Sequence, residues 1–233
     1  MEPTEQPTRS EFAQGFLEIL PLSVGTAAYG LAFGFLAAEA HMDGLVTGLM
    51  GAIVYAGSSQ IVGVERLVAG SGALAALIAG VALNLRLVLI TASLRDVLGN
   101  RPFWQTALGA HLSADENWSM MNRARRAGRQ VGYGYLIGGG IAQMAFWLAS
   151  TVAGAVFASS VVEPRALGLD FAFTAAFIAI LVGLWRGRVD ALPWIAAAGV
   201  TGLLMKLTPL DPSWSLIAGA LAGAAVAGAR SDE

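Results

Sequence analysis

The sequence predicts an all-α protein, a polytopic helix bundle embedded in a membrane. Hydrophobic residues make up 56% of its 233 residues, and only 13% are Asp, Glu, Lys or Arg. Several apolar segments also reach the roughly 20 residues that a helix needs to cross a bilayer. A soluble domain of this composition would leave large apolar surfaces in water. We therefore expect about six to eight membrane segments, some of them broken or re-entrant.

Three apolar segments precede residue 95. The first covers residues 16–38, and Pro21 within it removes one backbone hydrogen bond, so we expect a kink or a break there. The second covers residues 45–68 and contains a polar run in its middle. The third covers residues 72–94 and contains Asn84 and Arg86. Each segment is long enough to span the hydrocarbon core.

A polar stretch, residues 95–130, separates these segments from four further apolar spans. The later spans lie near residues 133–157, 169–185, 192–205 and 214–229. Together they predict a polar N-terminal tail over residues 1–14 and a single transmembrane domain over residues 15–230, with residues 95–130 cytoplasmic or interfacial. Within that stretch, residues 103–121 contain Asp115 and Glu116, which favours an interfacial helix over a crossing.

The arginines indicate the orientation, because cationic loops stay on the cytoplasmic side of the membrane. The first basic cluster contains Arg123, Arg125, Arg126 and Arg129, and the second contains Arg186 and Arg188. Three full crossings before the first cluster would place the N-terminus outside. A re-entrant second segment, or a fourth crossing through residues 103–121, would place it inside. The sequence leaves these alternatives open.

Small and aromatic residues indicate how the spans pack. Gly30 and Gly34 stand four residues apart within the first span, a spacing that lets helix backbones approach closely in lipid. Trp147, Trp185, Trp194 and Trp214 are expected to lie at the membrane interface, where such rings anchor a helix.

Arg86 is the most unusual residue of the spans, because a central arginine costs about 2.5 to 3.5 kcal/mol on insertion scales. It is too deep in its span to reach either surface easily, so we expect it to face the bundle interior. Its guanidinium either holds a carboxylate of a solute in two hydrogen bonds or forms a structural ion pair. For the ion pair, the candidate partners are Glu18, Glu65 and Asp170.

A run that is polar over Gly57, Ser58, Ser59 and Gln60 lies midway along the second segment; it begins at Tyr55 and Ala56. Helices broken at membrane depth are tolerated where they line a cavity, and their amide ends can hold an anionic group. The run therefore indicates either a substrate site or a polar contact between spans. Asp170, which precedes the apolar run of the fifth span, is either a helix N-cap or a protonatable coupling residue.

Composition also excludes several functions. A net charge of −2 leaves no basic surface for nucleic acid, and the absence of cysteine excludes disulfides and thiolate metal sites. Two histidines, His41 and His111, are too few for a multi-histidine metal site, and we expect no cofactor. The residues Gly57-Ser58-Ser59 fit a short serine-nucleophile pattern, but neither histidine lies within an apolar span to act as base. We therefore do not expect an intramembrane serine protease or any other enzyme.

Five short segments, taken in order, resemble the AzlC family over about residues 12–229. They are the Pro21 region with the glycine-rich stretch Tyr29 to Phe35, Tyr55-Ala-Gly-Ser-Ser-Gln60, Asn84-Leu-Arg86 with Ser93-Leu94, Asp115-Glu116, and Leu167-Gly-Leu-Asp-Phe171. Members of this family are the large subunits of two-component branched-chain amino acid exporters. The resemblance implies efflux of valine, leucine, isoleucine or methionine through a multi-pass protein of the cell inner membrane, with a small AzlD-like membrane subunit as partner.

An amino acid zwitterion requires an anion-binding element, a cation-binding element and an apolar pocket. For the substrate we expect contacts from Arg86, Asn84 and the run Gly57, Ser58, Ser59 and Gln60, and we give coupling or structural roles to Asp170, Glu18, Asp115 and Glu116. Because the chain has no nucleotide-binding loop, we expect export to be coupled to protons through a carboxylate. A channel for small molecules or ions, and a structural subunit that does not itself transport, remain the alternatives.

Overall fold

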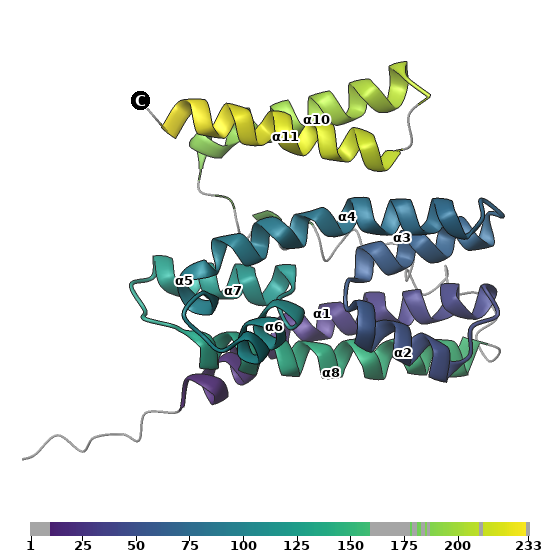
Figure 1. Ribbon diagram of the computed structural model, residues 1–233, viewed down its shortest axis with the longest axis horizontal. Helices are drawn as coiled ribbons and strands as arrows, with labels where there is room; N and C mark the ends of the chain where they lie inside the picture. Colours follow the sequence, from purple (N-terminus) through teal and green to yellow (C-terminus); the bar gives the residue numbers. More distant parts are fainter. Residues whose placement is uncertain are drawn as a thin grey trace, which may run out of the picture.

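The computed structural model describes residues 10–158, 178, 181–182, 185, 187–209 and 212–231. All the regular structure in this part of the chain is helical. Four helices are long and apolar enough to cross a membrane: α1 (Glu11–Glu39), α4 (Ala73–Ser93), α8 (Tyr133–Phe157) and α10 (Arg188–Leu207). The all-α, polytopic membrane bundle expected from the sequence is therefore confirmed (Figure 1). The expected span at residues 169–185 lies almost wholly outside the described residues.

Helices α1 and α8 run side by side in the same direction and form the centre of the bundle. Their backbones come so close that a Cβ on Gly34 would overlap the backbone of Thr151 and Gly154. At the other end of the pair, Gly15 lies against the backbone of Tyr135 in the same way. The close helix packing predicted from the glycine spacing in the first span is therefore confirmed, because only glycine allows two backbones to approach this closely.

Helix α1 continues through Pro21, so the expected break in the first span is wrong. A proline removes a single hydrogen bond of the helix ladder. The turns on either side of it are held by their packing against α8 and by hydroxyl groups that bond to the preceding turn. Ser23 Oγ, for example, donates to the Ile19 carbonyl oxygen at 3.2 Å.

The second apolar segment is broken, as the sequence allowed, into α2 (Gly44–Val54) and α3 (Gly57–Val68). Tyr55 lies between them with a left-handed φ of 37°, which ends α2 and turns the chain. Helix α2 enters along the C-terminal half of α8, where Gly44 faces Val156. Helix α3 returns beside the start of α4, where Gly63 faces Ala76. The segment is therefore a re-entrant hairpin and not a crossing.

Residues 103–121 are not the single interfacial helix that the sequence indicated. After the short α5 (Arg95–Leu98) they form α6 (Phe103–His111) and the first half of α7 (Asp115–Arg126). The Asn117 side chain stabilises the break, since it accepts a hydrogen bond from the Ala114 amide at 2.8 Å and donates one to the Leu112 carbonyl at 2.7 Å. This second hairpin packs on the N-terminal half of α8, where Leu112 contacts Gly140.

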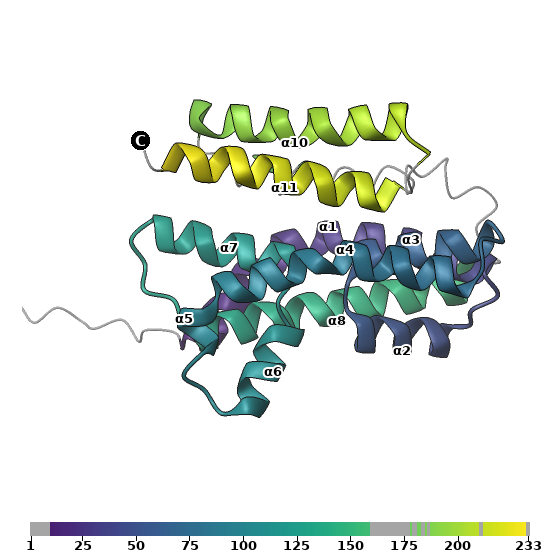
Figure 2. The ribbon, with the colours of Figure 1, turned by 45° about the horizontal axis from the view of Figure 1, so that its top comes forward.

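The two hairpins enter the bundle from opposite ends, and α3 and α7 run in opposite directions away from its middle (Figures 1 and 2). The start of α1 and the arginine-rich end of α7 lie at the same end of the molecule. Of the three arrangements left open by the sequence, the structure has the re-entrant second segment, with only α1 and α4 long enough to cross before Arg123. Helix α10 and α11 (Pro212–Ser231) form a separate helical hairpin that contacts α4.

Candidate functional site

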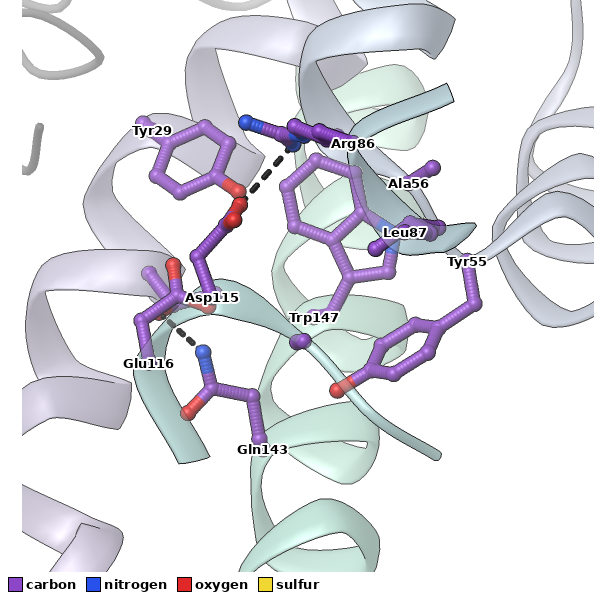
Figure 3. Close-up of a pocket in the computed structure, with 12 residues that line it drawn as sticks. Tyr29, Tyr55, Ala56, Arg86, Leu87, Asp115, Glu116, Gln143 and Trp147 are labelled. Atoms are coloured by element: carbon purple, nitrogen blue, oxygen red, sulfur yellow. Dashed lines mark hydrogen bonds and ion pairs between the residues drawn. The ribbon is translucent and has the colours of Figure 1, made fainter. Parts of the chain in front are cut away.

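A small cavity lies where the tips of the two re-entrant hairpins meet, between the middle parts of α1, α4 and α8 (Figure 3). Its walls are formed by Thr26, Tyr29, Tyr55, Ala56, Gly57, Arg86, Leu87, Ala114, Asp115, Glu116, Gln143 and Trp147. The cavity volume is about 20 Å³, which is space for about one water molecule. A solute of amino acid size would need the hairpins to move apart.

Arg86 reaches this cavity from the middle of α4 and pairs with Asp115 at the tip of the second hairpin. Its Nη2 lies 2.9 Å from Asp115 Oδ2, and the two side chains are 29% and 20% exposed. The pair explains how an arginine is accommodated so deep in an apolar helix. Of the partners suggested by the sequence, Glu18 and Glu65 lie elsewhere, and Asp170 is outside the described residues.

Glu116 follows Asp115 and is 6% exposed. No cation in the described part of the chain lies within ion-pair distance of Glu116. Burial raises the pKa of Glu116 to about 7, and the neighbouring Asp115 carboxylate adds to the rise. Burial also raises the pKa of Asp115, against the lowering effect of Arg86. With two carboxyl groups and one guanidinium on its walls, the cavity favours a cation or a proton.

On the opposite wall, the cavity offers hydrogen-bond donors. The first turn of α3 opens on it at Ala56 and Gly57, and Ala56, at the N-cap position, provides no side-chain cap for the first amides of the helix. Two further buried donors line the cavity, Tyr55 Oη and Trp147 Nε1, and neither has a hydrogen-bond partner among the described residues. Their residues are 7% and 2% exposed. A helix N-terminus with unpaired donors around it is suited to an anionic group.

Gly57 fits this wall because it has no side chain. A Cβ at this position would lie 2.5 Å from Tyr29 Oη and 3.1 Å from a ring carbon of Trp147. The glycine therefore lets two aromatic rings approach the first turn of α3, and the rings of Tyr29 and Trp147 themselves lie 5.0 Å apart. The side of the cavity next to the amides is thus largely aromatic.

Only two of the expected substrate residues, Arg86 and Gly57, line the cavity. Ser59 Oγ donates a hydrogen bond to Asn84 Oδ1 at 2.8 Å, so these two residues tie α3 to α4. Ser58 and Gln60 are buried in α3 behind the cavity wall, at 5% and 0% exposure. Neither has a hydrogen-bond partner for its side-chain polar atoms in the described part of the chain.

The acidic residues proposed for coupling fall into separate places. Asp115 and Glu116 line the cavity, whereas Glu18 lies at the arginine-rich end of the bundle. There its two carboxylate oxygens accept hydrogen bonds from Arg129 at 2.8 and 2.9 Å, and Tyr135 Oη donates to it at 2.6 Å. Glu18 is thus held in a local network away from the cavity. Asp170 lies outside the described residues.

Four residues that line the cavity were not selected as site residues from the sequence: Tyr29, Tyr55, Gln143 and Trp147. The expectation that Trp147 anchors its helix at the membrane interface is wrong, because Trp147 is almost fully buried in the bundle and stacks on Phe33 with ring centroids 5.6 Å apart. Gln143 Nε2 donates to Thr26 Oγ1 at 2.8 Å and so links α8 to α1. The sequence of an apolar helix does not show whether its aromatic and amide residues face a cavity, another helix or lipid.

One sequence signal does connect the two hairpin tips. Gly51-Ala52 precedes Ala56 by the same number of residues as Gly109-Ala110 precedes Ala114, and α3 and α7 each begin at the next residue. In both hairpins the glycine packs against an aromatic ring of α8, Trp147 in one and Tyr133 in the other. This repeated pattern would have placed Asp115 opposite Gly57.

Comparisons with known proteins agree with this architecture. The model of the AzlC family, described as AzlC protein, matches residues 21–161, more than half of the chain. The inner membrane protein YgaZ of Escherichia coli (strain K12) is 27% identical over 228 residues, which cover 95% of this chain and 92% of YgaZ. No solved structure matches the chain. Together with the four membrane-spanning helices, these matches identify a multi-pass protein of the inner membrane and support a role in membrane transport. The chain belongs to the AzlC family.

Proposed function

We propose that this protein exports branched-chain amino acids, namely valine, leucine and isoleucine, and also methionine, as a secondary transporter coupled to protons. The observation that carries the proposal is the cavity between the hairpin tips. It presents carboxyl groups at the start of α7, the first amides of α3 on the other side, the unpaired donors Tyr55 Oη and Trp147 Nε1, and aromatic and aliphatic groups. A zwitterion with an apolar side chain requires this combination.

The carboxylate of the substrate fits the donor wall. The first amides of α3, beside Gly57, carry the positive end of the helix dipole, and Tyr55 Oη and Trp147 Nε1 add two unpaired donors. Broken helices in other transporters hold anionic substrate groups with the same kind of half-helix N-terminus. In this arrangement Arg86 remains paired with Asp115 and holds the second hairpin in place.

The ammonium group fits the acidic wall at the start of α7, where Asp115 and Glu116 leave an excess of one negative charge over Arg86. The side chain of the substrate would then lie against Leu87, Tyr29 and Trp147. These contacts are apolar and carry no hydrogen-bond requirement, which suits aliphatic side chains better than polar ones.

Transport requires that the cavity opens to each side in turn. The hairpin α2–α3 closes it from one end of the bundle and α6–α7 closes it from the other, so that outward movement of either tip would give access from one side only. We further propose that a small AzlD-like membrane subunit assembles with this chain in the inner membrane.

Efflux from loaded cells tests this proposal. Cells that contain the chain with and without the small partner are loaded with labelled leucine, valine or methionine, and efflux is followed before and after collapse of the proton gradient. We expect saturable efflux that external unlabelled substrate accelerates and that collapse of the gradient slows. Arg86→Ala should reduce it strongly. Absence of trans-stimulation would indicate a channel, and full efflux with Arg86→Ala would indicate a scaffolding subunit.

A further inference from the structure

Glu116 differs from the other acidic residues described in the structure. Asp115, Glu18 and Asp96 are each paired with an arginine. Asp190, which is also buried, begins α10 and does not line the cavity. Glu116 is therefore the one buried acidic residue of the described chain that faces the cavity without a cationic partner.

The groups that surround Glu116 come from every element around the cavity. Asp115 precedes it on α7, Arg86 faces it from α4, Tyr29 from α1 and Tyr55 from the break in the first hairpin. From α8 the cavity receives uncharged Gln143 and Trp147. The ring of His111 lies beyond Tyr55, with the two ring centroids 6.0 Å apart. The single guanidinium among these groups is already bonded to Asp115.

We propose that Glu116 binds the ammonium group of the substrate and a proton in turn, so that each amino acid that enters the cavity displaces one proton. This inference rests on the proposed function and names the residue at which export and proton entry are exchanged. Its basis is geometric: Glu116 is a buried carboxyl group on the cavity wall that no cation of the described residues pairs with, and one carboxylate cannot carry a proton and pair with an ammonium group at the same time.

The exchange balances in charge and in protons. On the side where the amino acid enters, the carboxylic acid of Glu116 releases its proton to water, and the resulting carboxylate pairs with the substrate ammonium. On the other side a proton from water returns to the carboxylate, and the zwitterion leaves unchanged. One proton therefore moves inward for each amino acid that moves outward. A pKa of about 7 allows both forms of Glu116 to be populated near neutral pH.

Calorimetry with the purified full-length chain measures this exchange directly. Leucine is titrated into the protein in pairs of buffers whose different ionisation enthalpies reveal the number of protons released, phosphate and Bis-Tris at pH 6 and phosphate and Tris at pH 8.5. At pH 6 we expect close to one proton per leucine, and at pH 8.5 close to none, because Glu116 is then already ionised. Below pH 7 the Kd for leucine should rise about tenfold for each pH unit.

Variants of Glu116 test whether the released proton comes from this residue. Glu116→Gln should abolish proton release and weaken leucine binding about tenfold, which corresponds to about 1.4 kcal/mol. Glu116→Asp should retain release with a shifted pH dependence, and it decides the question if the glutamine variant does not fold. Asp96→Asn removes a carboxylate of an exposed ion pair outside the cavity and serves as the matched control, with unchanged release.

The outcomes separate the two proposals. If leucine, valine, isoleucine and methionine all fail to bind to the unmodified protein, the proposed function is wrong. If leucine binds without proton release, or if Glu116→Gln releases as many protons as the unmodified protein, the exchange at Glu116 is wrong and the transport of amino acids stands.

Discussion

At the scale of single residues, two ion pairs with the same geometry have different surroundings. Arg86 and Asp115 lie 2.9 Å apart at the cavity, and so do Arg125 and Asp96 at the end of the bundle, where the aspartate is 60% exposed. An exposed pair contributes about 0 to 1 kcal/mol. The cavity pair is half-buried, at 29% and 20% exposure, so loss of one partner leaves a charge that water compensates only in part, and the cost should lie between this value and the about 3 to 5 kcal/mol of a fully buried pair. The cavity pair should therefore stabilise the protein more than the exposed pair does.

This difference predicts the behaviour of four variants. Arg86→Gln and Asp115→Asn should each lower the thermal midpoint of the detergent-solubilised protein by several degrees, and the double variant should recover more than half of that loss. The same replacements at Arg125 and Asp96 should change the midpoint little. Differential scanning fluorimetry measures all of these midpoints. Equal losses at the two pairs would show that the cavity pair is as solvated as the surface one.

Gly57 determines how close the aromatic rings come to the start of α3. In Gly57→Ala the new methyl group must displace Tyr29 or Trp147 into a cavity that has no spare volume. We expect leucine binding to weaken at least about tenfold while the protein still folds. Gly63→Ala on the same helix is the control, because a Cβ there would meet only the Ala76 carbonyl oxygen at 3.7 Å. Equal affinity in both variants would exclude this wall from the site.

At the scale of helices, the closeness of α1 and α8 depends on individual glycines. Gly34→Ala should lower the yield of folded protein and its thermal midpoint, because its Cβ would overlap backbone atoms of Thr151 and Gly154 that cannot rotate away. A Cβ at Gly25 on the same helix would meet no atom of the described residues within 4 Å, so Gly25→Ala should be neutral or slightly stabilising, since alanine favours a helix over glycine. Comparison of the two variants by size-exclusion profile and scanning fluorimetry tests the packing.

The two hairpins show how much of the fold the sequence could predict. A polar run with a glycine in the middle of an apolar segment marks the break at Tyr55, because polar groups in a span are costly unless they line a cavity or have hydrogen-bond partners. Residues 103–121 did not suggest a break inside the bundle, since two adjacent acidic residues, Asp115 and Glu116, are typical of a surface. Their burial depends on Arg86 and on the bonds of Asn117 to the turn before it. Partners that lie far apart in the sequence leave no local pattern.

For the site, the sequence identified the chemistry better than the positions. Arg86 and Gly57 could be selected because each breaks the pattern of its own span. Trp147 and Tyr29 could not, because aromatic residues are common in apolar helices and only the approach of α3 brings them together. Ser59 and Asn84 were selected for the same reason as Arg86, yet they satisfy each other between two helices. A polar residue within a span predicts a hydrogen-bonding or charged partner, but it does not show whether that partner is a solute or another residue of the protein.

At the scale of the whole molecule, charge is distributed unevenly between the two ends of the bundle. The arginines between α4 and α8 gather at the end where α1 begins; they are Arg95, Arg101, Arg123, Arg125, Arg126 and Arg129. The loop between α3 and α4 lies at the opposite end. Since loops rich in arginine remain in the cytoplasm, we predict that the start of α1 and the loop after α7 are cytoplasmic and that the loop between α3 and α4 faces the outside.

Single cysteines test this orientation without background, because the chain has no cysteine of its own. Ser71→Cys in the α3–α4 loop and Gln130→Cys after α7 both lie at exposed positions. In intact spheroplasts a membrane-impermeant maleimide should label Cys at position 71 and not at position 130, and permeabilisation should make both reactive. Because the first hairpin re-enters without crossing, residue 71 and the end of α1 share a side, and His41→Cys should follow position 71. If only the cysteine at position 130 is labelled from outside, the orientation of the bundle is the reverse of the one predicted. If the cysteines at positions 41 and 71 give opposite results, the first hairpin crosses the membrane.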